Sequence, residues 1–289
     1  MWQYNPFTNK LDKVNKYNKI LTVGKGGDYT KLSDALNSIT DASETNRYCI
    51  VVIGKIVDNA QINAKSYVDI IGFSADVTVQ TDSNVHGVVF DSVIETEWKG
   101  ITIRRKGDVT SAVYACFIKG ITNKTCRLVN CRFINEISAA VNYCYGMLIG
   151  DSASPTITNC KVQGGSGGSS CHGIGIWGSA SPTITGCEIQ GGSGGSSCHG
   201  IGIWGSALPT ITGCKAQGGS GGNSCYCIGI WGSASPTITG CESIGGVISS
   251  HNINFLESFQ PYSDKPYMLF SIAVYVNTCL LYTSPSPRD

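Results

Sequence analysis

The stretch Gly178–Trp204 is GSASPTITGCEIQGGSGGSSCHGIGIW, and the chain repeats it on both sides with few changes. The preceding copy, Asp151–Trp177, is DSASPTITNCKVQGGSGGSSCHGIGIW, and the following copy, Gly205–Trp231, is GSALPTITGCKAQGGSGGNSCYCIGIW. A fourth copy begins at Gly232–Ser243 with GSASPTITGCES. The period of 27 residues lies in the range that indicates solenoids, propellers or arrays.

Each copy contains two short runs typical of β-strands, PTITGC and GIGIW, divided by Gly and Ser turns. No helical stripe lies between the two runs, which excludes leucine-rich and ankyrin repeats. A four-stranded propeller blade needs about 40 residues, more than this period provides. The repeat therefore predicts a coil of parallel strands that stacks on its neighbours at about 4.8 Å.

The pattern SPTITNC followed by GIGIWGS resembles the repeats of right-handed parallel β-helices in the pectate-lyase-like superfamily. The resemblance covers Tyr48 to Thr278 and is strongest between Lys124 and Ser243. It implies an all-β fold, a right-handed parallel β-helix whose regular coils have 27 residues.

Equivalent positions of successive coils form columns of consistent chemistry. One turn position holds only residues that tolerate a left-handed backbone, namely Asn130, Asn159, Gly186, Gly213 and Gly240. Isoleucines are expected to line the interior at Ile157, Ile184, Ile211 and Ile238, and in two columns that begin at Ile174 and Ile176. Opposite charges should pair between adjacent coils at Lys161, Glu188, Lys215 and Glu242.

The region 19–48 is predicted to cap the solenoid. Ile20–Ile39 (ILTVGKGGDYTKLSDALNSI) contains a strand, a glycine turn and an amphipathic helix near Thr30–Ile39. A solenoid needs such a cover because an open end exposes apolar core and unpaired strand edges. The same string resembles the N-terminal segment of pectin methylesterases. The preceding WQYNPFTNKLDKV resembles short segments of phage particle proteins, which implies a virion anchor in residues 1–18.

The β-helix is predicted over residues 49–278, with the regular repeats at 151–243 and a long inserted loop at 244–269. Ser271–Thr278 (SIAVYVNT) resembles the GIGIWGS strand again. Residues 279–289, CLLYTSPSPRD, resemble the translation of a sequencing adapter. We therefore expect a metagenomic read in which the native protein is truncated near Thr278.

The composition argues against two classes of partner. Lys plus Arg (21) almost balance Asp plus Glu (20), so the chain has no net field to hold a nucleic acid. No apolar stretch approaches the roughly 20 residues of a membrane helix, and the first residues lack the pattern of a secretory signal.

The 14 cysteines are expected as reduced, buried thiols, because free thiols are the common state in a reducing compartment. Most of them fall into two columns, which we expect to face inward. The columns are Cys131, Cys160, Cys187, Cys214 and Cys241, and Cys144, Cys171, Cys198 and Cys225.

The resemblance makes an enzyme the first hypothesis, but the catalytic strings of the family are missing. The chain lacks DFIFG, QAVA and GRPW of pectin methylesterases, WIDH of pectate lyases, and NTD, DD and GHG of polygalacturonases. A charged group remains in the irregular coils, in which two carboxylates could act as acid and base on a glycosidic bond or could be solvated charges at turns. These weak catalytic candidates are Asp91, Glu95, Glu97, Arg104, Arg105 and Asp108. Because the catalytic strings are missing and the charged group is weak evidence, the sequence favours a protein that is not an enzyme.

The repeats predict neither a cofactor nor a metal site. His172 and His199 share a column and have Cys171 and Cys198 beside them, but Tyr226 replaces the next histidine and the spacing fits no zinc-finger pattern. The GGSGGSS loops lack the Asp of calcium-binding nonapeptides and the Lys-Ser/Thr of phosphate loops. We expect flexible turns there.

Trp177, Trp204 and Trp231 end the GIGIW run of successive coils. Because the isoleucines face inward, alternation places the indoles outward as an exposed, stacked stripe. Such a stripe could bind the flat faces of sugar rings, stabilise itself by stacking, or contact a partner chain.

These observations favour a non-catalytic, extracellular or virion-associated stalk or adhesin, similar to a phage tail fibre. Its expected partners are polysaccharides or cell-surface glycans and further copies of the same chain, with the three tryptophans as ligand-binding residues. One alternative is a polysaccharide-degrading enzyme whose site lies in the irregular coils or beyond the truncation. The other is a bacterial surface β-helix protein.

Overall fold

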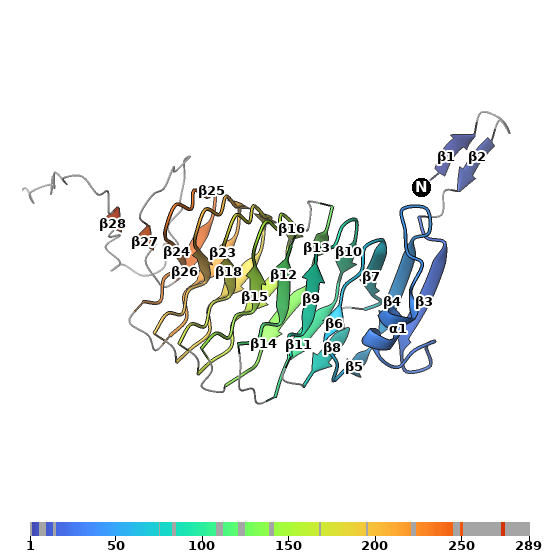
Figure 1. Cartoon of the computed structure of the whole chain (residues 1–289), viewed down its shortest axis with the longest axis horizontal. Helices are drawn as coiled ribbons and strands as arrows, with labels where there is room; N and C mark the ends of the chain where they lie inside the picture. The colour runs from blue at the N-terminus through green and yellow to red at the C-terminus, as the bar shows by residue number, and fades with distance from the viewer. Residues whose placement is uncertain are drawn as a thin grey trace, which may run out of the picture.

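The chain folds into an elongated solenoid of parallel strands, drawn lengthwise in Figure 1. The computed structural model describes residues 2–5, 10–13, 16–74, 76–82, 85–107, 112–120, 125–138, 142–167, 169–194, 196–220, 224–244, 249–250 and 273–274. Beside the solenoid, β1 (Trp2–Asn5) and β2 (Lys10–Lys13) pair as an antiparallel hairpin.

Each coil contributes one strand to each of three sheets, and about 8 coils are stacked. Sheet 1 contains β3 (Lys19–Gly24), β4 (Tyr48–Ile53), β7 (Val68–Gly72), β10 (Glu97–Lys99), β13 (Arg127–Val129), β16 (Thr156–Thr158), β19 (Thr183–Thr185), β22 (Thr210–Thr212) and β25 (Thr237–Thr239). Sheet 2 contains β5 (Lys55–Val57), β8 (Thr78–Thr81), β11 (Thr102–Arg105), β14 (Arg132–Asn135), β17 (Lys161–Gln163), β20 (Glu188–Gln190), β23 (Lys215–Gln217) and β26 (Glu242–Ile244). Sheet 3 contains β6 (Ile62–Asn63), β9 (Val88–Asp91), β12 (Cys116–Lys119), β15 (Met147–Ile149), β18 (Ile174–Ile176), β21 (Ile201–Ile203), β24 (Ile228–Ile230), β27 (Ser249–Ser250) and β28 (Ala273–Val274).

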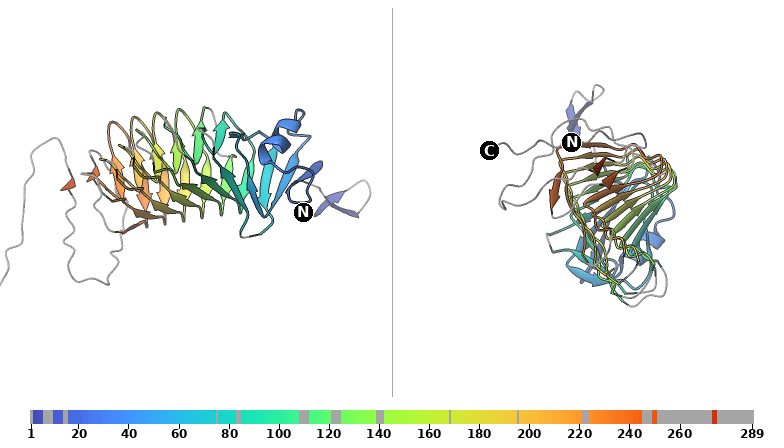
Figure 2. Two further views of the ribbon diagram at one scale, coloured as in Figure 1. Left: turned by 90° about the horizontal axis from the view of Figure 1, so that it is seen from below. Right: turned by 90° about the vertical axis from the view of Figure 1, so that its left-hand side faces the viewer.

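The interior is filled by aliphatic columns in register. Ile157, Ile184 and Ile211 are paired across β16, β19 and β22 and are fully buried. The columns that begin at Ile174 and Ile176 are buried in the same way. Along the solenoid axis the coils lie one behind another on a common outline (Figure 2). The predicted right-handed parallel β-helix is confirmed.

The turn between sheets 1 and 2 contains the predicted left-handed residue in five successive coils. The φ angles are 53° at Asn130, 51° at Asn159, 62° at Gly186, and 59° at both Gly213 and Gly240. Most L residues lose about 1–2 kcal/mol in this conformation, which explains why this column contains only Asn and Gly.

The predicted outward charge column is also present. The Lys161 ammonium lies 2.8 Å from the Glu188 carboxylate, and Lys215 lies 3.1 Å from Glu242. Lys161 and Glu188 are exposed, so this pair contributes at most a few tenths of a kcal/mol. Its main effect is that Glu188 faces the opposite charge of Lys161 in the coil before it, whereas Lys161 also has Arg132 as a register neighbour on its other side.

The N-terminal end of the solenoid is covered as predicted. Helix α1 (Leu32–Ser38) is slightly shorter than expected and buries Leu32 and Ala35 against the first coils. The buried carboxylate of Asp58 accepts hydrogen bonds from the Ser33 N–H at 2.7 Å and the Ser33 hydroxyl at 2.8 Å, and so holds the first turn. Strand β3 extends sheet 1 by pairing in parallel with β4.

Several predictions concern residues outside the described part of the chain. The virion-anchor and adapter hypotheses stay predictions, as does the division of the chain into segments. Of the predicted strand Ser271–Thr278, the described residues of β28 pair in parallel with β27 in sheet 3. Among the described residues, no helix is both long and apolar enough to cross a membrane.

The two cysteine columns, both expected to face inward, are buried in two different cores. Cys131, Cys160, Cys187, Cys214 and Cys241 lie in the main core. Cys144, Cys171 and Cys198 instead pack with Val113 and Ile137 in a small separate cluster. The physical reason is that the chain between sheets 2 and 3 projects outward in each coil and forms a lobe. The cysteines of the second column precede the strands of sheet 3 and face this lobe. The described cysteines are free thiols.

The described residues of the GGSGGSS loops, which were expected as flexible turns, form these lobes and stack between adjacent coils. Parallel bridges join the lobes of adjacent coils at Ser166, Ser193 and Ser220. The Gly192 N–H donates to the Cys171 carbonyl at 2.7 Å. A Cβ on Gly192 would lie 1.5 Å from the Gly165 carbonyl oxygen. Glycine is therefore required by the close approach of the lobes.

Gly192→Ala is expected to destabilise the solenoid more than Gly213→Ala. The new methyl at Gly192 would collide with backbone, at a cost at or above the upper end of the ~1–3 kcal/mol usual for overpacking. At Gly213 nothing lies within 4 Å of the added Cβ, so only the left-handed strain of about 1–2 kcal/mol remains. Urea unfolding measures both losses, and equal losses would contradict the role of close lobe stacking.

Denatured but non-reduced protein is expected to expose nearly all of its 14 cysteines to a thiol reagent. Side chains at one register position of parallel strands point the same way, which disfavours the dihedral angle of a disulfide even where the distance allows one. Thiol titration of the unfolded chain tests this, with the native protein as the protected control. Recovery of half or fewer would show that the columns are cross-linked.

Candidate functional site

The charged candidates of the irregular coils do not form one site. Asp91 ends β9 in sheet 3, and its carboxylate lies 2.9 Å from the Lys119 ammonium. Glu95 lies in the turn before sheet 1 with a φ of 48°, and Glu97 begins β10 in sheet 1. The described carboxylates of the group are therefore divided between two faces of the solenoid.

The basic candidates lie on a third face. Arg104 and Arg105 end β11 in sheet 2. Arg104 points outward and lies 3.4 Å from the Glu136 carboxylate, whereas Arg105 is fully buried. Asp108 lies outside the described residues. The catalytic role of the six charged candidates stays a prediction that no described geometry supports.

Glu95 and Glu97 do share a hollow on the outer face of sheet 1 with a third carboxylate, the buried Asp69. Each of the three is matched by a cation, as follows. Lys16 lies 2.6 Å from Asp69, Arg47 lies 2.8 Å from Glu95, and Arg127 lies 3.9 Å from Glu97. Each carboxylate of the trio is therefore engaged in an ion pair, and the hollow presents no arrangement of a separate acid and base.

The same network fastens the N-terminal segment to the solenoid. The Tyr17 hydroxyl donates to Asp69 at 2.9 Å, and the Glu97 N–H donates to Asp69 at 2.7 Å. Burial and the neighbouring carboxylate raise the pKa of Tyr17 to about 12, against the opposing effect of Lys16. Asp69 therefore has a structural role in this hollow, because it holds residues 16–17 against sheet 1.

A ladder of stacked rings runs along the outer face of sheet 3. One ring per coil contributes to it, namely His86, Tyr114, Tyr145, His172, His199 and Tyr226. Neighbouring centroids are 4.6 to 5.4 Å apart and interplanar angles range from 2° to 32°. These distances lie close to the strand spacing, so the register of the coils imposes the stacking.

Trp204 and Trp231 cover this ladder from outside. Their rings stack on each other at 5.3 Å and 9°. Trp204 lies 5.1 Å from His172, and Trp231 lies 4.8 Å from His199. Each indole folds back over the glycine two residues earlier in its own strand, Gly202 in the case of Trp204, where the missing side chain leaves room. Both tryptophans are half-buried and contribute to packing.

Trp177 differs from the other two and is 43% exposed. Tyr145 and Leu148 of the preceding coil fill the space above Gly175, so the Trp177 indole lies over Gly150 instead of folding back. The prediction of three equivalent, exposed and stacked indoles is therefore wrong. Two tryptophans pack on the ladder, and one offers its ring to solvent; the ligand-binding role of the three stays a prediction.

The ladder histidines are held in their neutral form. His86, His172 and His199 accept hydrogen bonds at Nδ1 from the backbone N–H of the next coil, at 3.2, 3.0 and 3.1 Å. An imidazole that accepts at Nδ1 carries its proton on Nε2. Burial lowers the pKa of His86 and His199 to about 4, with Arg105 and Lys119 adding to the effect at His86. Burial, with a smaller effect of His199, lowers the pKa of His172 well below its ordinary value.

Stability is therefore expected to fall as the pH drops from about 6.5 towards 4. In this window the unfolded histidines, with ordinary pKa values near 6.5, bind protons that the folded ones do not. Each histidine then contributes a slope of at most about 1.4 kcal/mol per pH unit. Urea unfolding at several pH values measures the slope.

The matched control is the double variant His172→Tyr with His199→Tyr, because tyrosine already occupies this column at Tyr145 and Tyr226. The variant should show a shallower pH dependence between pH 6.5 and 4. An unchanged slope would assign the acid sensitivity to the carboxylates.

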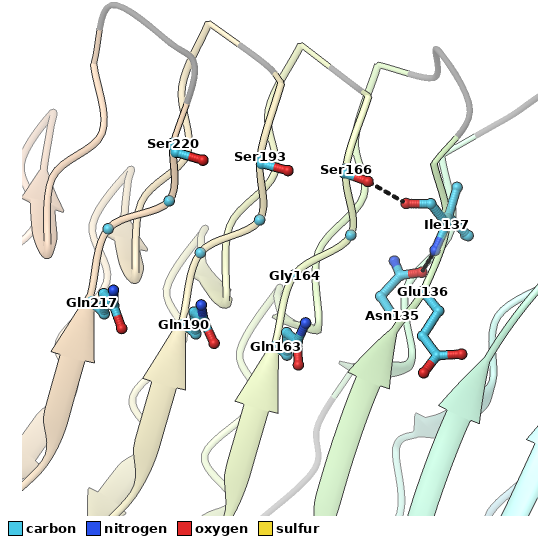
Figure 3. Close-up of a pocket in the computed structure, with 15 residues that line it drawn as sticks. Asn135, Glu136, Ile137, Gln163, Gly164, Ser166, Gln190, Ser193, Gln217 and Ser220 are labelled. Atoms are coloured by element: carbon cyan, nitrogen blue, oxygen red, sulfur yellow. Dashed lines mark hydrogen bonds between the residues drawn. The ribbon is translucent and has the colours of Figure 1, made fainter.

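A polar groove runs along the base of the lobes (Figure 3). It repeats one amide and one hydroxyl per coil at Gln163, Gln190 and Gln217, and at Ser166, Ser193 and Ser220. Asn135 and Glu136 lie at its N-terminal end, where Glu136 is engaged by Arg104 and Lys106 at 3.4 and 3.6 Å. The groove thus offers neutral hydrogen-bonding groups at regular intervals, without a free acid.

The described residues contain no group of three or more His, Cys, Asp and Glu side chains arranged to hold a metal ion. What the surface offers is recognition chemistry. The exposed aromatic surface suits the apolar face of a sugar ring, and the amides and hydroxyls of the groove suit its hydroxyl groups.

No family model matches the chain, and no curated protein matches it. Among solved structures, pectin methylesterase from carrot has a TM-score of 0.55 at 14% identity, covering 88% of this chain and 80% of the enzyme. Pectin methylesterase PemA from Erwinia chrysanthemi has a TM-score of 0.46 at 10% identity, covering 86% and 93%. The tailspike protein of Acinetobacter phage vB_ApiP_P1 has a TM-score of 0.47 at 13% identity, covering 87% and 59%. At these identities the likeness shows the fold alone.

Sequence reasoning missed the first three rings of the ladder, because the coils before residue 151 differ in length and hide the period. A local signal was available. HGVVF at His86, YACFI at Tyr114 and YGMLI at Tyr145 share with HGIGI an aromatic ring, a small residue and an alternating apolar strand. It also missed the buried Asp69, whose partners are distant in sequence.

Proposed function

We propose that this protein is a non-catalytic β-helix that binds glycans, an extracellular or virion-associated stalk of the adhesin type. The observation that carries the proposal is the outward aromatic surface of sheet 3. The stacked ladder lies beneath this aromatic surface, and Trp177 projects from the surface with 43% of its own area exposed. Tyr143, 45% exposed, adds a second accessible ring beside Tyr145.

Rigid aromatic rings suit this task because they offer a large contact area at a low cost in side-chain entropy. Sugar rings present flat C–H faces that pack on such surfaces, while their hydroxyls need polar partners. The groove of Gln and Ser side chains supplies such partners on the other side of the lobes. The likeness of WQYNPFTNKLDKV to phage particle segments supports a virion location.

Trp177→Ala is expected to weaken polysaccharide binding roughly tenfold or more with little change in thermal midpoint, because its ring is exposed. The matched control is Trp231→Ala, which removes a ring stacked on Trp204 and His199. It should lower stability by about 2–3 kcal/mol and leave the binding of folded protein nearly intact. Retention on a polysaccharide array and a thermal melt measure the two effects.

Equal binding by the Trp177→Ala variant and the parent would contradict the assignment of the site to sheet 3. In that case the triple variant Gln163→Ala, Gln190→Ala and Gln217→Ala tests the polar groove. A parent protein that binds no polysaccharide would contradict the glycan function as a whole. Release of methanol or of shortened chains from the array polysaccharides would favour the alternative, a polysaccharide-degrading enzyme.

A further inference from the structure

The end of β11 contains an unusual buried cation. Arg105 is 0% exposed, and its Nε donates a hydrogen bond to the Val85 carbonyl at 2.7 Å. Its two terminal nitrogens, Nη1 and Nη2, are buried and have no hydrogen-bond partner in the described part of the chain. Thr81 is its register neighbour in β8, and among the same residues the buried Thr81 hydroxyl has no partner either. Three unsatisfied polar atoms thus belong to one column of sheet 2.

The next coil shows what this position requires structurally. Asn135 is the register partner of Arg105 in β14. Its amide nitrogen donates to the carbonyls of Val113 at 3.1 Å and Tyr145 at 2.9 Å, which ties sheet 2 to sheet 3. Arg105 makes the equivalent link with Nε alone. The remaining part of the guanidinium, with its charge, is therefore not needed for closing the corner.

An unpaired cation in this place is costly. Burying a charge without a partner is strongly unfavourable, and arginine does not escape this penalty by losing its proton at neutral pH. Asp82 is the described carboxylate whose charge acts on it, but Asp82 is exposed and accepts hydrogen bonds from Gln80 at 3.1 and 2.9 Å. No ion pair joins Asp82 to Arg105 among the described residues.

The positive charge is also felt by its neighbour. After burial, Arg105 is the next largest cause that lowers the pKa of His86 to about 4. Burial lowers the pKa of the Arg105 guanidinium, and Asp82 only partly opposes this effect. Both directions agree with a cation that no described side chain neutralises.

We propose that Arg105 and Thr81 bind a small inorganic anion of the halide class inside the solenoid, at the corner between sheets 2 and 3. Nη1, Nη2 and the Thr81 hydroxyl supply its donors. A monovalent, roughly spherical anion balances the single charge and accepts from several directions. A phosphate or sulfate would bring a second negative charge and more acceptor atoms than the unsatisfied donors of this column can meet.

Halide binding to the folded state should stabilise it in a saturable way. The full chain is melted in methanesulfonate buffer with increasing chloride, or bromide, at constant ionic strength. The parent midpoint is expected to rise by several degrees and then level off. Arg105→Met should abolish this response, because the side chain that holds the anion is replaced by an apolar one of similar length.

The matched control is Arg104→Met, which removes the same charge from the exposed side of the same strand and should keep the full halide response. An equal loss of response in both variants would indicate general screening and would overturn the proposal. A parent midpoint that does not depend on halide would also overturn the proposal. It would mean that the chain itself neutralises Arg105.

If Arg105→Met does not fold, the parent protein alone decides the question. Crystals grown in bromide should show an anomalous peak beside Nη1, Nη2 and the Thr81 hydroxyl. A water-filled or empty position there would overturn the proposal. Neither result bears on glycan binding at sheet 3, which lies on the outer surface.

Discussion

The rest of the structure depends on in-register stacking of coils at the spacing of hydrogen-bonded parallel strands. Each residue of a regular coil lies between its equivalents in the coils before and after it, about 4.8 Å away. A column is therefore stable only if its residue type tolerates copies of itself at that distance. Isoleucine and cysteine meet this condition in the cores by packing, and Lys161 and Lys215 meet it by pairing with a glutamate in the next coil.

Aromatic rings meet the same condition by stacking, which accounts for the ladder on sheet 3. A spacing of 4.6 Å between His172 and His199 is imposed by the strands and not selected by the rings. Burial and the Nδ1 hydrogen bonds favour the neutral form of the ladder histidines. In the described part of the chain, the histidines of the ladder therefore stay neutral in the neutral pH range.

The sites of interest arise where a column changes its residue type. Leu148 and Tyr145 occupy the space that Gly175 leaves open, so Trp177 is displaced outward while Trp204 folds back. Arg105 stands where the next coil has Asn135, so a charge remains buried. Regular columns stabilise the solenoid, and their interruptions produce the exposed ring and the unsatisfied guanidinium. The structural likeness to pectin methylesterase from carrot, at 14% identity, concerns the fold and carries no activity with it.

The amino-acid sequence by itself determined the solenoid, because a repeated strand pattern can bury its apolar face only by stacking on copies of itself. It also determined the Asn and Gly corner, whose left-handed turn few other residues adopt, and the cap by α1, whose apolar face follows helical periodicity. These features depend on local conformation and on nearest neighbours along a constant period.

Only the tertiary structure decided which core Cys144 joins and which of the tryptophans is exposed. It also decided that Asp69 binds Lys16 and Tyr17, which lie some fifty residues earlier in the sequence. In each case the deciding contact comes from another coil, at a distance in sequence that varies with loop length. Trp177 and Trp204 end identical GIGIW strings, yet the coil before each of them presents a different side chain. Their exposure therefore depends on packing between coils, which the strings themselves do not contain.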